Sequence, residues 1–102
     1  MGVSLIYCFD LDETLCTSVE LNYLKSSPIK SRIQKVNELY DEGHVIKIHT
    51  ARGSQTGIDW AEVTRKQLEE WGLKFHELYF GKPFADFYVD DKAVNCSDFA
   101  WE

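Results

Sequence analysis

The fold of this chain is decided by the stretch Leu5-Ile6-Tyr7-Cys8-Phe9-Asp10-Leu11-Asp12-Glu13-Thr14. Residues 5–9 form a short continuous apolar run, which predicts a buried strand. Two carboxylates, Asp10 and Asp12, follow it directly. Placing like charges so close together is unfavourable unless a divalent cation or a catalytic role balances them. A simple turn at the end of the strand is the alternative, so the rest of the chain must decide.

Length and charge limit the protein to a few classes. The 102 residues suffice for one domain, residues 1–102, and 44% of them are hydrophobic, enough to build a core. The 17 acidic and 11 basic residues leave a net charge of −6. Nucleic-acid binding requires a basic face, so we expect no nucleic-acid partner.

The cysteines and the hydropathy pattern indicate the cellular compartment. Cys8, Cys16 and Cys96 include no close pair, so neither a zinc site nor a closed disulfide framework is expected. No signal peptide and no apolar stretch of membrane-spanning length is visible, so we expect no membrane partner. These features predict a protein of the reducing cytoplasm.

Strand-like and helix-like segments alternate along the chain, as in α/β proteins. The expected strands are residues 5–9, 45–48, 78–80 and 87–89. The expected helices start at Ser27-Pro28, with Ser27 as N-cap, and at Asp59, and they end at Gly43 and Gly72. Between the first strand and the first helix, Val19, Leu21 and Tyr23 alternate with polar residues and suggest a small hairpin flap. Helical crossovers imply a parallel sheet.

Each expected strand ends in polar residues of a particular kind. The first ends at Asp10 and Asp12, the second at His49-Thr50, the third before Gly81-Lys82 and the fourth at Asp90-Asp91. The carboxyl ends of parallel strands share one edge, where open α/β sheets bind ligands. Phosphoryl transfer needs carboxylates that hold Mg²⁺, a nucleophile and a proton donor, and it also uses hydroxyls and an ammonium. The residues at these strand ends supply all of these groups.

At these positions the chain resembles the haloacid dehalogenase-like (HAD) phosphohydrolases. Phe9 to Leu15 is similar to the DxDxT motif of that superfamily, although Glu13 is often Gly there. Ile48-His49-Thr50, Lys82 and Val89-Asp90-Asp91 are similar to the second, third and fourth motifs, in the family's order. The resemblance implies a three-layer Rossmann-like parallel sheet with helices on both faces.

The resemblance also implies a role for each motif residue. Asp10 would be the nucleophile and a Mg²⁺ ligand, and Asp12 the general acid/base, whose backbone carbonyl also reaches the metal. Thr50 and Lys82 would bind the phosphoryl group, and Lys82 would also steady Asp10. Asp90 would be the third metal ligand. The remaining candidates are Asp91, as a supporting residue acting through water or Lys82, and Thr14, as a phosphate-binding hydroxyl.

The gaps between the motifs narrow the subclass. Residues 15–27 and 51–81 are too short to hold a cap domain, so the chain resembles capless members with an open site. Segments 50–53, 80–83 and 88–92 are similar to segments of small phosphatases of capsular polysaccharide biosynthesis. The expected activity is Mg²⁺-dependent hydrolysis of a small phosphate ester, in particular a sugar phosphate, through an aspartyl phosphate. Because a second subunit can cover an open site, a homo-oligomer is left open as an alternative to the monomer.

Two other functions remain open. The sequence DLDETL also resembles phosphatases that act on the RNA polymerase tail, although their larger insert is missing here. A non-catalytic phosphoacceptor module would combine the same residue types, but receiver domains carry their paired acids before the phosphoacceptor rather than after it.

Several residues allow two interpretations. Arg52 could bind the phosphate or an acidic leaving group, or be an ordinary surface arginine. The loop 53–57 could touch the leaving group or serve only as a connector. Tyr23 and Leu21 could cover the site or pack in the core. His49 is expected to be structural, and residues 99–101 are expected to dock onto the domain.

Overall fold

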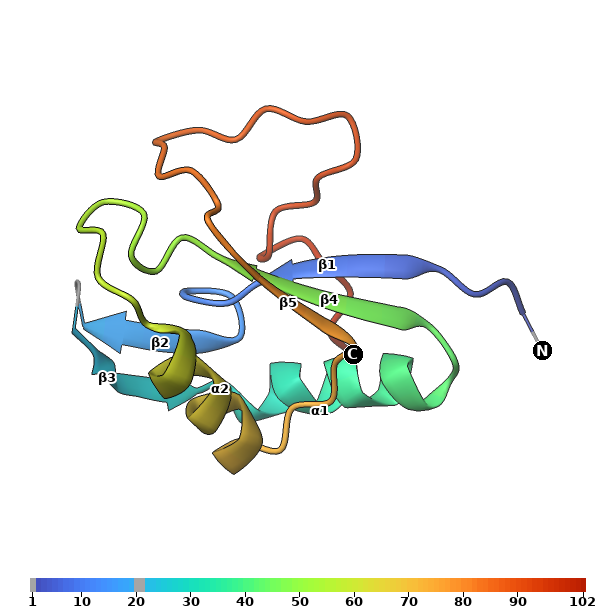
Figure 1. Ribbon diagram of the computed structural model, residues 1–102. Helices are drawn as coiled ribbons and strands as arrows, with labels where there is room; N and C mark the ends of the chain where they lie inside the picture. Colours follow the sequence, from blue (N-terminus) through green and yellow to red (C-terminus); the bar gives the residue numbers. More distant parts are fainter. Residues whose placement is uncertain (1, 20–21) are drawn as a thin grey trace.

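The computed structural model describes residues 2–19 and 22–102. Its main sheet has three parallel strands in the order β1 (Ile6–Asp10), β4 (Val45–Thr50) and β5 (Glu77–Phe80) (Figure 1). The helices α1 (Lys30–Asp41) and α2 (Ala61–Glu70) connect these strands, and a hairpin of β2 (Cys16–Val19) and β3 (Asn22–Pro28) follows β1. The predicted α/β class and parallel sheet are confirmed.

The strand register brings three of the predicted strand ends together. Asp10 at the end of β1 lies opposite His49 of β4, and Thr50 lies opposite Phe80 at the end of β5. All three strands run in the same direction, so their carboxyl ends form one edge of the sheet. This edge carries the candidate site.

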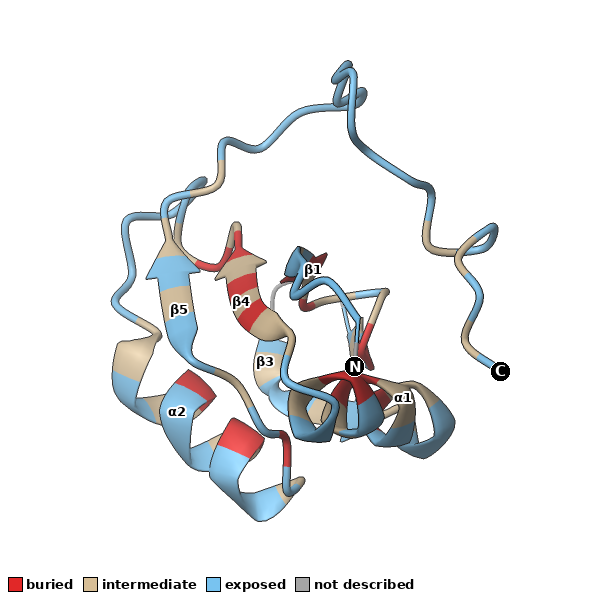
Figure 2. Cartoon of the chain, turned by 90° about the vertical axis from the view of Figure 1, so that its right-hand side faces the viewer, coloured by how far each residue is buried: buried red, intermediate tan, exposed pale blue. Residues whose placement is uncertain are grey.

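Both helices cover the same face of the sheet (Figures 1 and 2). Alternate residues of the central strand, Ile46, Ile48 and Thr50, are fully buried beneath them. On the opposite face Ile6 keeps 66% of its surface exposed and Tyr79 46%. The prediction of helices on both faces is therefore wrong for the described chain. Two right-handed crossovers that step across the sheet in the same direction place both helices on one side.

One hydrophobic cluster fills the space between the sheet and the helices. The sheet side contributes Phe9, Ile46 and Ile48, and the helices contribute Ile33, Val36, Leu39 and Leu68. The apolar positions of α1 recur at intervals of three, which points one face of the helix at the sheet. Within the part of the chain that the structure describes, neither helix has the length and apolar character to span a bilayer.

The hairpin β2–β3 confirms the predicted flap, although Leu21, which was expected on it, lies outside the described residues. The predicted helix start at Ser27-Pro28 is wrong. Ser27 pairs with Thr17 and Pro28 with Cys16, so both end β3, and α1 begins at Lys30. A proline is tolerated at a strand edge, and here the pairing across the hairpin outweighed the capping signal.

The second helix begins close to its predicted start. The Asp59 carboxylate accepts a hydrogen bond from the backbone N–H of Ala61 at 2.9 Å, and α2 runs from Ala61 to Glu70 with Trp60 at its N-cap, one residue after the predicted position. Thr64 and Leu68 on its inner face are fully buried. Gly72, in a left-handed conformation with φ of +70°, follows the helix as predicted.

The fourth predicted strand, residues 87–89, is wrong. The chain leaves β5 as an extended segment that stands away from the sheet (Figure 1), and Phe87 and Val89 are 85% and 98% exposed. A parallel strand needs a crossover of about a dozen residues or more, and only residues 81–86 separate this segment from β5. The chain is too short there to return in parallel.

The end of the chain docks onto β1, as predicted. The Phe99 ring lies edge-on against Phe9 at 5.5 Å between centroids, and the Trp101 ring lies 5.8 Å from Phe9. The guanidinium of Arg32, on α1, lies over the Trp101 ring, 4.9 Å from the ring centroid. These rings shield the free side of β1 and hold it against α1.

Candidate active site

A tight turn presents the first motif at the carboxyl edge of the sheet. The carbonyl oxygen of Leu11 accepts hydrogen bonds from the backbone N–H groups of Leu15 (2.8 Å) and Cys16 (3.3 Å). Leu11 and Leu15 are fully buried and anchor the turn. Glu13 has a φ of +62°, a left-handed conformation that is unfavourable for residues other than glycine. The anchored ends leave Asp12 and Glu13 projecting from the edge.

Asp10 and Lys82 meet at this edge, as the sequence predicts. Gly81, with a φ of +92°, redirects the chain after β5, and the backbone N–H of Lys82 donates to the Thr50 carbonyl at 3.2 Å. The Lys82 ammonium then lies 3.4 Å from Asp10 Oδ2 and 4.0 Å from the centroid of the Tyr88 ring. The Asp10 side chain keeps 34% of its surface exposed, so it is accessible to a ligand.

Asp12 is held by a second set of contacts. Arg52 Nε donates to Asp12 Oδ2 at 3.0 Å, and Arg52 Nη2 donates to Oδ1 at 2.9 Å. Ser18 Oγ donates to Oδ1 at 2.5 Å, whereas Thr50 Oγ1 contacts Oδ2 at the longer distance of 3.4 Å. Charge-assisted bonds of this two-point kind fix the orientation of a carboxylate. Asp12 is therefore an oriented group, and Oδ2 is its less encumbered oxygen.

Arg52 is not a surface arginine, because only 3% of its surface is exposed. Besides the bonds to Asp12, Nη1 donates to Thr64 Oγ1 at 2.9 Å and to Gln67 Oε1 at 2.6 Å, and Nη2 donates to Ser26 Oγ at 3.2 Å. A guanidinium has five N–H groups, and these contacts engage all of them. In this arrangement Arg52 positions Asp12, and a contact with a substrate phosphate would require it to release a partner.

Thr50 and Thr14 occupy different places at the edge. Thr50 is fully buried, and its hydroxyl accepts a hydrogen bond from the Arg52 backbone N–H at 3.0 Å besides contacting Asp12. Thr14 is half-buried in the turn, where its carbonyl accepts from Arg32 Nη1 at 3.0 Å. The Thr50 hydroxyl thus contacts Asp12, whereas Thr14 is bonded to Arg32 through its backbone.

Asp90 and Asp91 are not gathered with the other acids. Both are exposed in the segment after β5, where Asp90 Oδ1 accepts the backbone N–H of Lys92 at 2.7 Å, a bond that lowers the pKa of Asp90. Among residues 2–19 and 22–102, no three His, Cys, Asp or Glu side chains lie together in a way that could hold a metal ion. The structure therefore does not assemble the predicted set of Asp10, Asp12 and Asp90.

Burial and charge shift the acidity of three side chains around the site. Burial, followed by the charge of Asp12, raises the pKa of Cys16 to about 12, so its thiol stays protonated. Burial also raises the pKa of Tyr23. Burial, followed by the charge of Lys82, lowers the pKa of His49. The His49 side chain faces away from the Thr50 hydroxyl, as predicted, and lies near the charges of Asp10 and Lys82, so its structural role stays a prediction.

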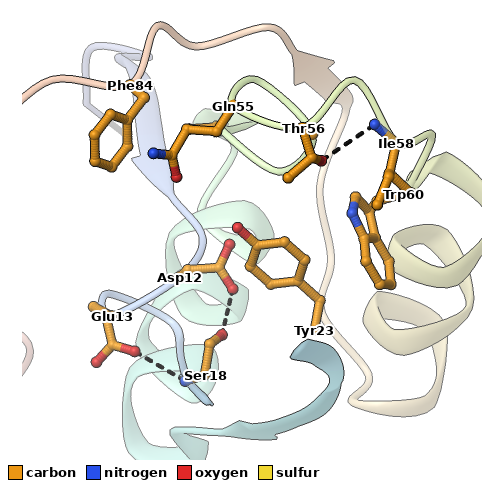
Figure 3. A pocket seen from close by; sticks show the side chains of 11 residues that line it. Asp12, Glu13, Ser18, Tyr23, Gln55, Thr56, Ile58, Trp60 and Phe84 are labelled. Carbon is orange, nitrogen blue, oxygen red and sulfur yellow. Dashed lines mark hydrogen bonds between the residues drawn. The ribbon is translucent and has the colours of Figure 1, made fainter. Parts of the chain in front are cut away.

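Beside Asp12 lies a cavity of about 370 Å³ (Figure 3). The turn and the flap contribute Glu13, Ser18 and Tyr23 to its wall. The loop after β4 and the segment after β5 contribute Ala51, Gly53, Gln55, Thr56, Ile58, Trp60 and Phe84. The loop 53–57 is therefore part of a cavity wall as well as a connector, and Tyr23 of the flap closes one side of it.

The sequence did not reveal several of these neighbours. Neither Thr64 nor Gln67 was predicted as a partner of Arg52. Their spacing of three residues on α2 places both on the same side of the helix, which is the signal that could have linked them. No sequence pattern around Phe84 predicts its place at the cavity, because it is 61% exposed and lies outside the helices and strands.

Comparison with known proteins adds support for the fold. No protein-family model and no curated protein matches the chain. One solved structure that is similar is the crystal structure of an MCSG target from Vibrio cholerae, with a TM-score of 0.79 and 29% sequence identity. The match covers 91% of this chain and 85% of that one. The likeness supports the α/β architecture described above.

Proposed function

We propose that the protein is a Mg²⁺-dependent phosphomonoesterase of the HAD type that hydrolyses a small phosphorylated metabolite through an aspartyl-phosphate intermediate. One observation carries the proposal: the accessible carboxylate of Asp10 has the Lys82 ammonium 3.4 Å away, and the oriented carboxylate of Asp12 follows two residues later. A nucleophile, a cation and a second acid at one sheet edge are the groups that phosphoryl transfer uses.

In the first step an oxygen of Asp10 attacks phosphorus while the bond from phosphorus to the ester oxygen breaks. Lys82 offsets negative charge on the carboxylate and on the phosphoryl oxygens. The leaving oxygen takes a proton from Asp12. We assign this proton to Oδ2, because Arg52 Nη2 and Ser18 both donate to Oδ1 and only Arg52 Nε and the more distant Thr50 hydroxyl contact Oδ2.

In the second step the Asp12 carboxylate takes a proton from water, and the water oxygen attacks phosphorus. The bond between Asp10 and phosphorus breaks and inorganic phosphate leaves. Asp12 gives up the proton to solvent as it pairs with Arg52 again in the free protein, and it takes up a proton when the next phosphate ester binds. Because Arg52 fixes Asp12 from the buried side, the same oxygen serves as acid and then as base.

The residues at the edge fit a Mg²⁺ ion in part. Mg²⁺ binds through one or two carboxylates together with waters and substrate phosphate oxygens. Asp10 provides such a carboxylate, whereas Asp90 is not gathered with it. When bound, the ion would offset the repulsion between the Asp10 carboxylate and the incoming phosphate.

The test is hydrolysis of p-nitrophenyl phosphate by purified protein, with and without Mg²⁺. We expect Mg²⁺-dependent turnover and a loss on the order of 10³-fold or more in kcat for Asp10→Asn, because the substitution removes the nucleophile. Asp41→Asn is the matched control. Asp41 ends α1 and pairs with Lys74 at 2.8 Å, close to the start of β4 and thus at the opposite edge of the sheet.

Two results would overturn the proposal. One is Asp10→Asn protein that folds normally and retains wild-type activity. The other is a phosphate that stays bound to Asp10 without being released by water, which would favour the phosphoacceptor alternative. Thermal unfolding of each variant distinguishes loss of activity from loss of fold.

A further inference from the structure

The cavity beside Asp12 is placed where the leaving group of the proposed reaction must lie. Asp12 contributes to its wall, and the cavity extends from there between the flap and the loop after β4 (Figure 3). The leaving oxygen has to reach Asp12 to receive its proton. A substrate with phosphorus at Asp10 and its leaving oxygen at Asp12 would therefore extend the remainder of the molecule into this cavity.

The charges that line the cavity all have one sign. The carboxyl groups of its wall belong to Asp12, which gives its proton to the leaving oxygen, and to Glu13, and no Lys, Arg or His belongs to the wall among residues 2–19 and 22–102. The nearby Arg52 lies behind the Tyr23 ring, 4.7 Å from its centroid, and all its N–H groups are engaged. Nothing in the described wall would balance a negative charge on the leaving group.

The Glu13 carboxylate is fixed at the cavity by a costly local structure. Its backbone takes a φ of +62°, which costs roughly 1–2 kcal/mol for a residue other than glycine. Its Oε1 accepts the backbone N–H of Ser18 on the flap at 2.9 Å. Strain of this kind persists where the surrounding structure over-determines it, which often happens at a binding site. Here the strained residue holds a negative charge at the wall.

The rest of the wall combines aromatic rings with neutral polar groups. Tyr23 packs edge-on against Trp60 at 5.1 Å between ring centroids, and Phe84 lies across the opening from them (Figure 3). The Gln55 amide points into the space between these rings, and the Thr56 hydroxyl also lines the wall. Rings pack against the C–H faces of a ligand, while amides and hydroxyls bond to its hydroxyl groups.

The volume agrees with a small ligand. A cavity of about 370 Å³ lies at the lower end of the range of roughly 300–1,000 Å³ that small-molecule sites occupy. A monosaccharide fits a site of this size and has an apolar ring face and several hydroxyls.

We infer that this cavity is a leaving-group subsite that accepts an uncharged monosaccharide and rejects anionic leaving groups. The inference rests on the proposed phosphatase function and on the expected sugar phosphate, and it adds to them a preference for an uncharged sugar and the residues that select it. Glu13 provides the repulsion, and the Tyr23, Trp60 and Phe84 rings provide the packing surface.

The test compares two substrates with the same sugar ring. Glucose 1-phosphate and glucuronic acid 1-phosphate differ only in the carboxylate at carbon 6 of the second. We expect kcat/KM for glucose 1-phosphate to be about threefold higher, because a second carboxylate brought beside the exposed Glu13 carboxylate meets a repulsion that solvent partly screens. Glu13→Gln preserves the acceptor for Ser18 and removes the charge, so it should narrow this ratio.

A second variant tests the packing surface without risk to the core. Phe84→Ala should raise KM for glucose 1-phosphate about fivefold, because it removes one aromatic wall from a side chain that is 61% exposed. Its inhibition by inorganic phosphate should not change, because phosphate does not enter the cavity. Phe87→Ala is the matched control, since Phe87 belongs to the same segment, is 85% exposed and does not line the cavity.

The outcomes separate this inference from the proposed function. If neither p-nitrophenyl phosphate nor either sugar phosphate is hydrolysed in the presence of Mg²⁺, both the proposed function and the subsite are wrong. If p-nitrophenyl phosphate is hydrolysed in an Asp10-dependent way, but the two sugar phosphates are turned over equally or not at all, only the subsite is wrong. Equal effects of Phe84→Ala and Phe87→Ala would also overturn it.

Discussion

The two aspartates of the first motif should differ sharply in what they contribute to stability. Asp12 is bound by Arg52, whose side chain has no exposed surface, whereas Asp10 meets Lys82 through one 3.4 Å contact at a partly exposed position. Asp12→Asn removes the charge opposite a buried guanidinium and turns an amide N–H₂ toward N–H donors. Asp10→Asn removes only one side of a partly solvated pair. Both substitutions keep the size of the side chain.

The expected magnitudes follow from these environments. Removing one partner of a buried ion pair costs about 3–5 kcal/mol. We expect about 3 kcal/mol for Asp12→Asn, at the lower end, because 21% of the Asp12 side chain is exposed. For Asp10→Asn we expect less than about 1 kcal/mol, as for other solvated pairs.

Urea unfolding followed by circular dichroism, in buffer without Mg²⁺, measures the difference. With a denaturant slope of about 1.5 kcal/mol per molar, Asp12→Asn should lower the midpoint by about 2 M, and Asp10→Asn by less than about 0.7 M. Equal losses for the two variants, or a loss below about 1 kcal/mol for Asp12→Asn, would refute the assignment of Arg52 as the group that holds Asp12.

Three further predictions concern the neighbourhood of the site. In Gly53→Ala the new Cβ would lie 2.3 Å from the Ile58 carbonyl oxygen. Gly57 has a similar positive φ but open space where a Cβ would stand, so Gly53→Ala should lower the urea midpoint more than Gly57→Ala does. Equal losses of stability would contradict the clash. Burial and a nearby ammonium lower the pKa of His49, so below its ordinary value of 6.5 the unfolded chain binds more protons than the folded chain. Stability should therefore decrease as the pH is lowered through that range. In His49→Gln the urea midpoint should decrease less between about pH 7.5 and 5.5. The Cys16 thiol, with a pKa of about 12, should resist iodoacetamide in the native protein and react after unfolding, which peptide mass spectrometry can follow; rapid native labelling would show that it is not buried.

The sequence predicts the site edge well where a residue ends an apolar run. Asp10, Thr50 and Lys82 each follow such a run, and parallel pairing then places them at one edge without further information. The proximity of Lys82 to Asp10 is a direct consequence of this arrangement. Such positions depend on local pattern and strand direction, which a sequence shows.

Features that depend on contacts between distant segments could not be predicted in the same way. Whether Arg52 is buried depends on Ser26, Thr64 and Gln67, which lie on the flap and on α2. The apolar residues 87–89 satisfy a strand pattern, but the short connection after β5 prevents a parallel return. The side of the sheet that each helix covers depends on strand order, which the apolar pattern does not encode.

Arg52 also makes three separate segments interdependent. Ser26 belongs to β3, Thr64 and Gln67 belong to α2, and Asp12 belongs to the turn after β1, and one guanidinium donates to all of them. A displacement of the flap that draws Ser26 away would leave a buried N–H without its acceptor and loosen Asp12 at the same time. Substitutions at Ser26 and Asp12 should therefore have non-additive effects on stability, although Ser26 lies on β3 and Asp12 in the turn after β1.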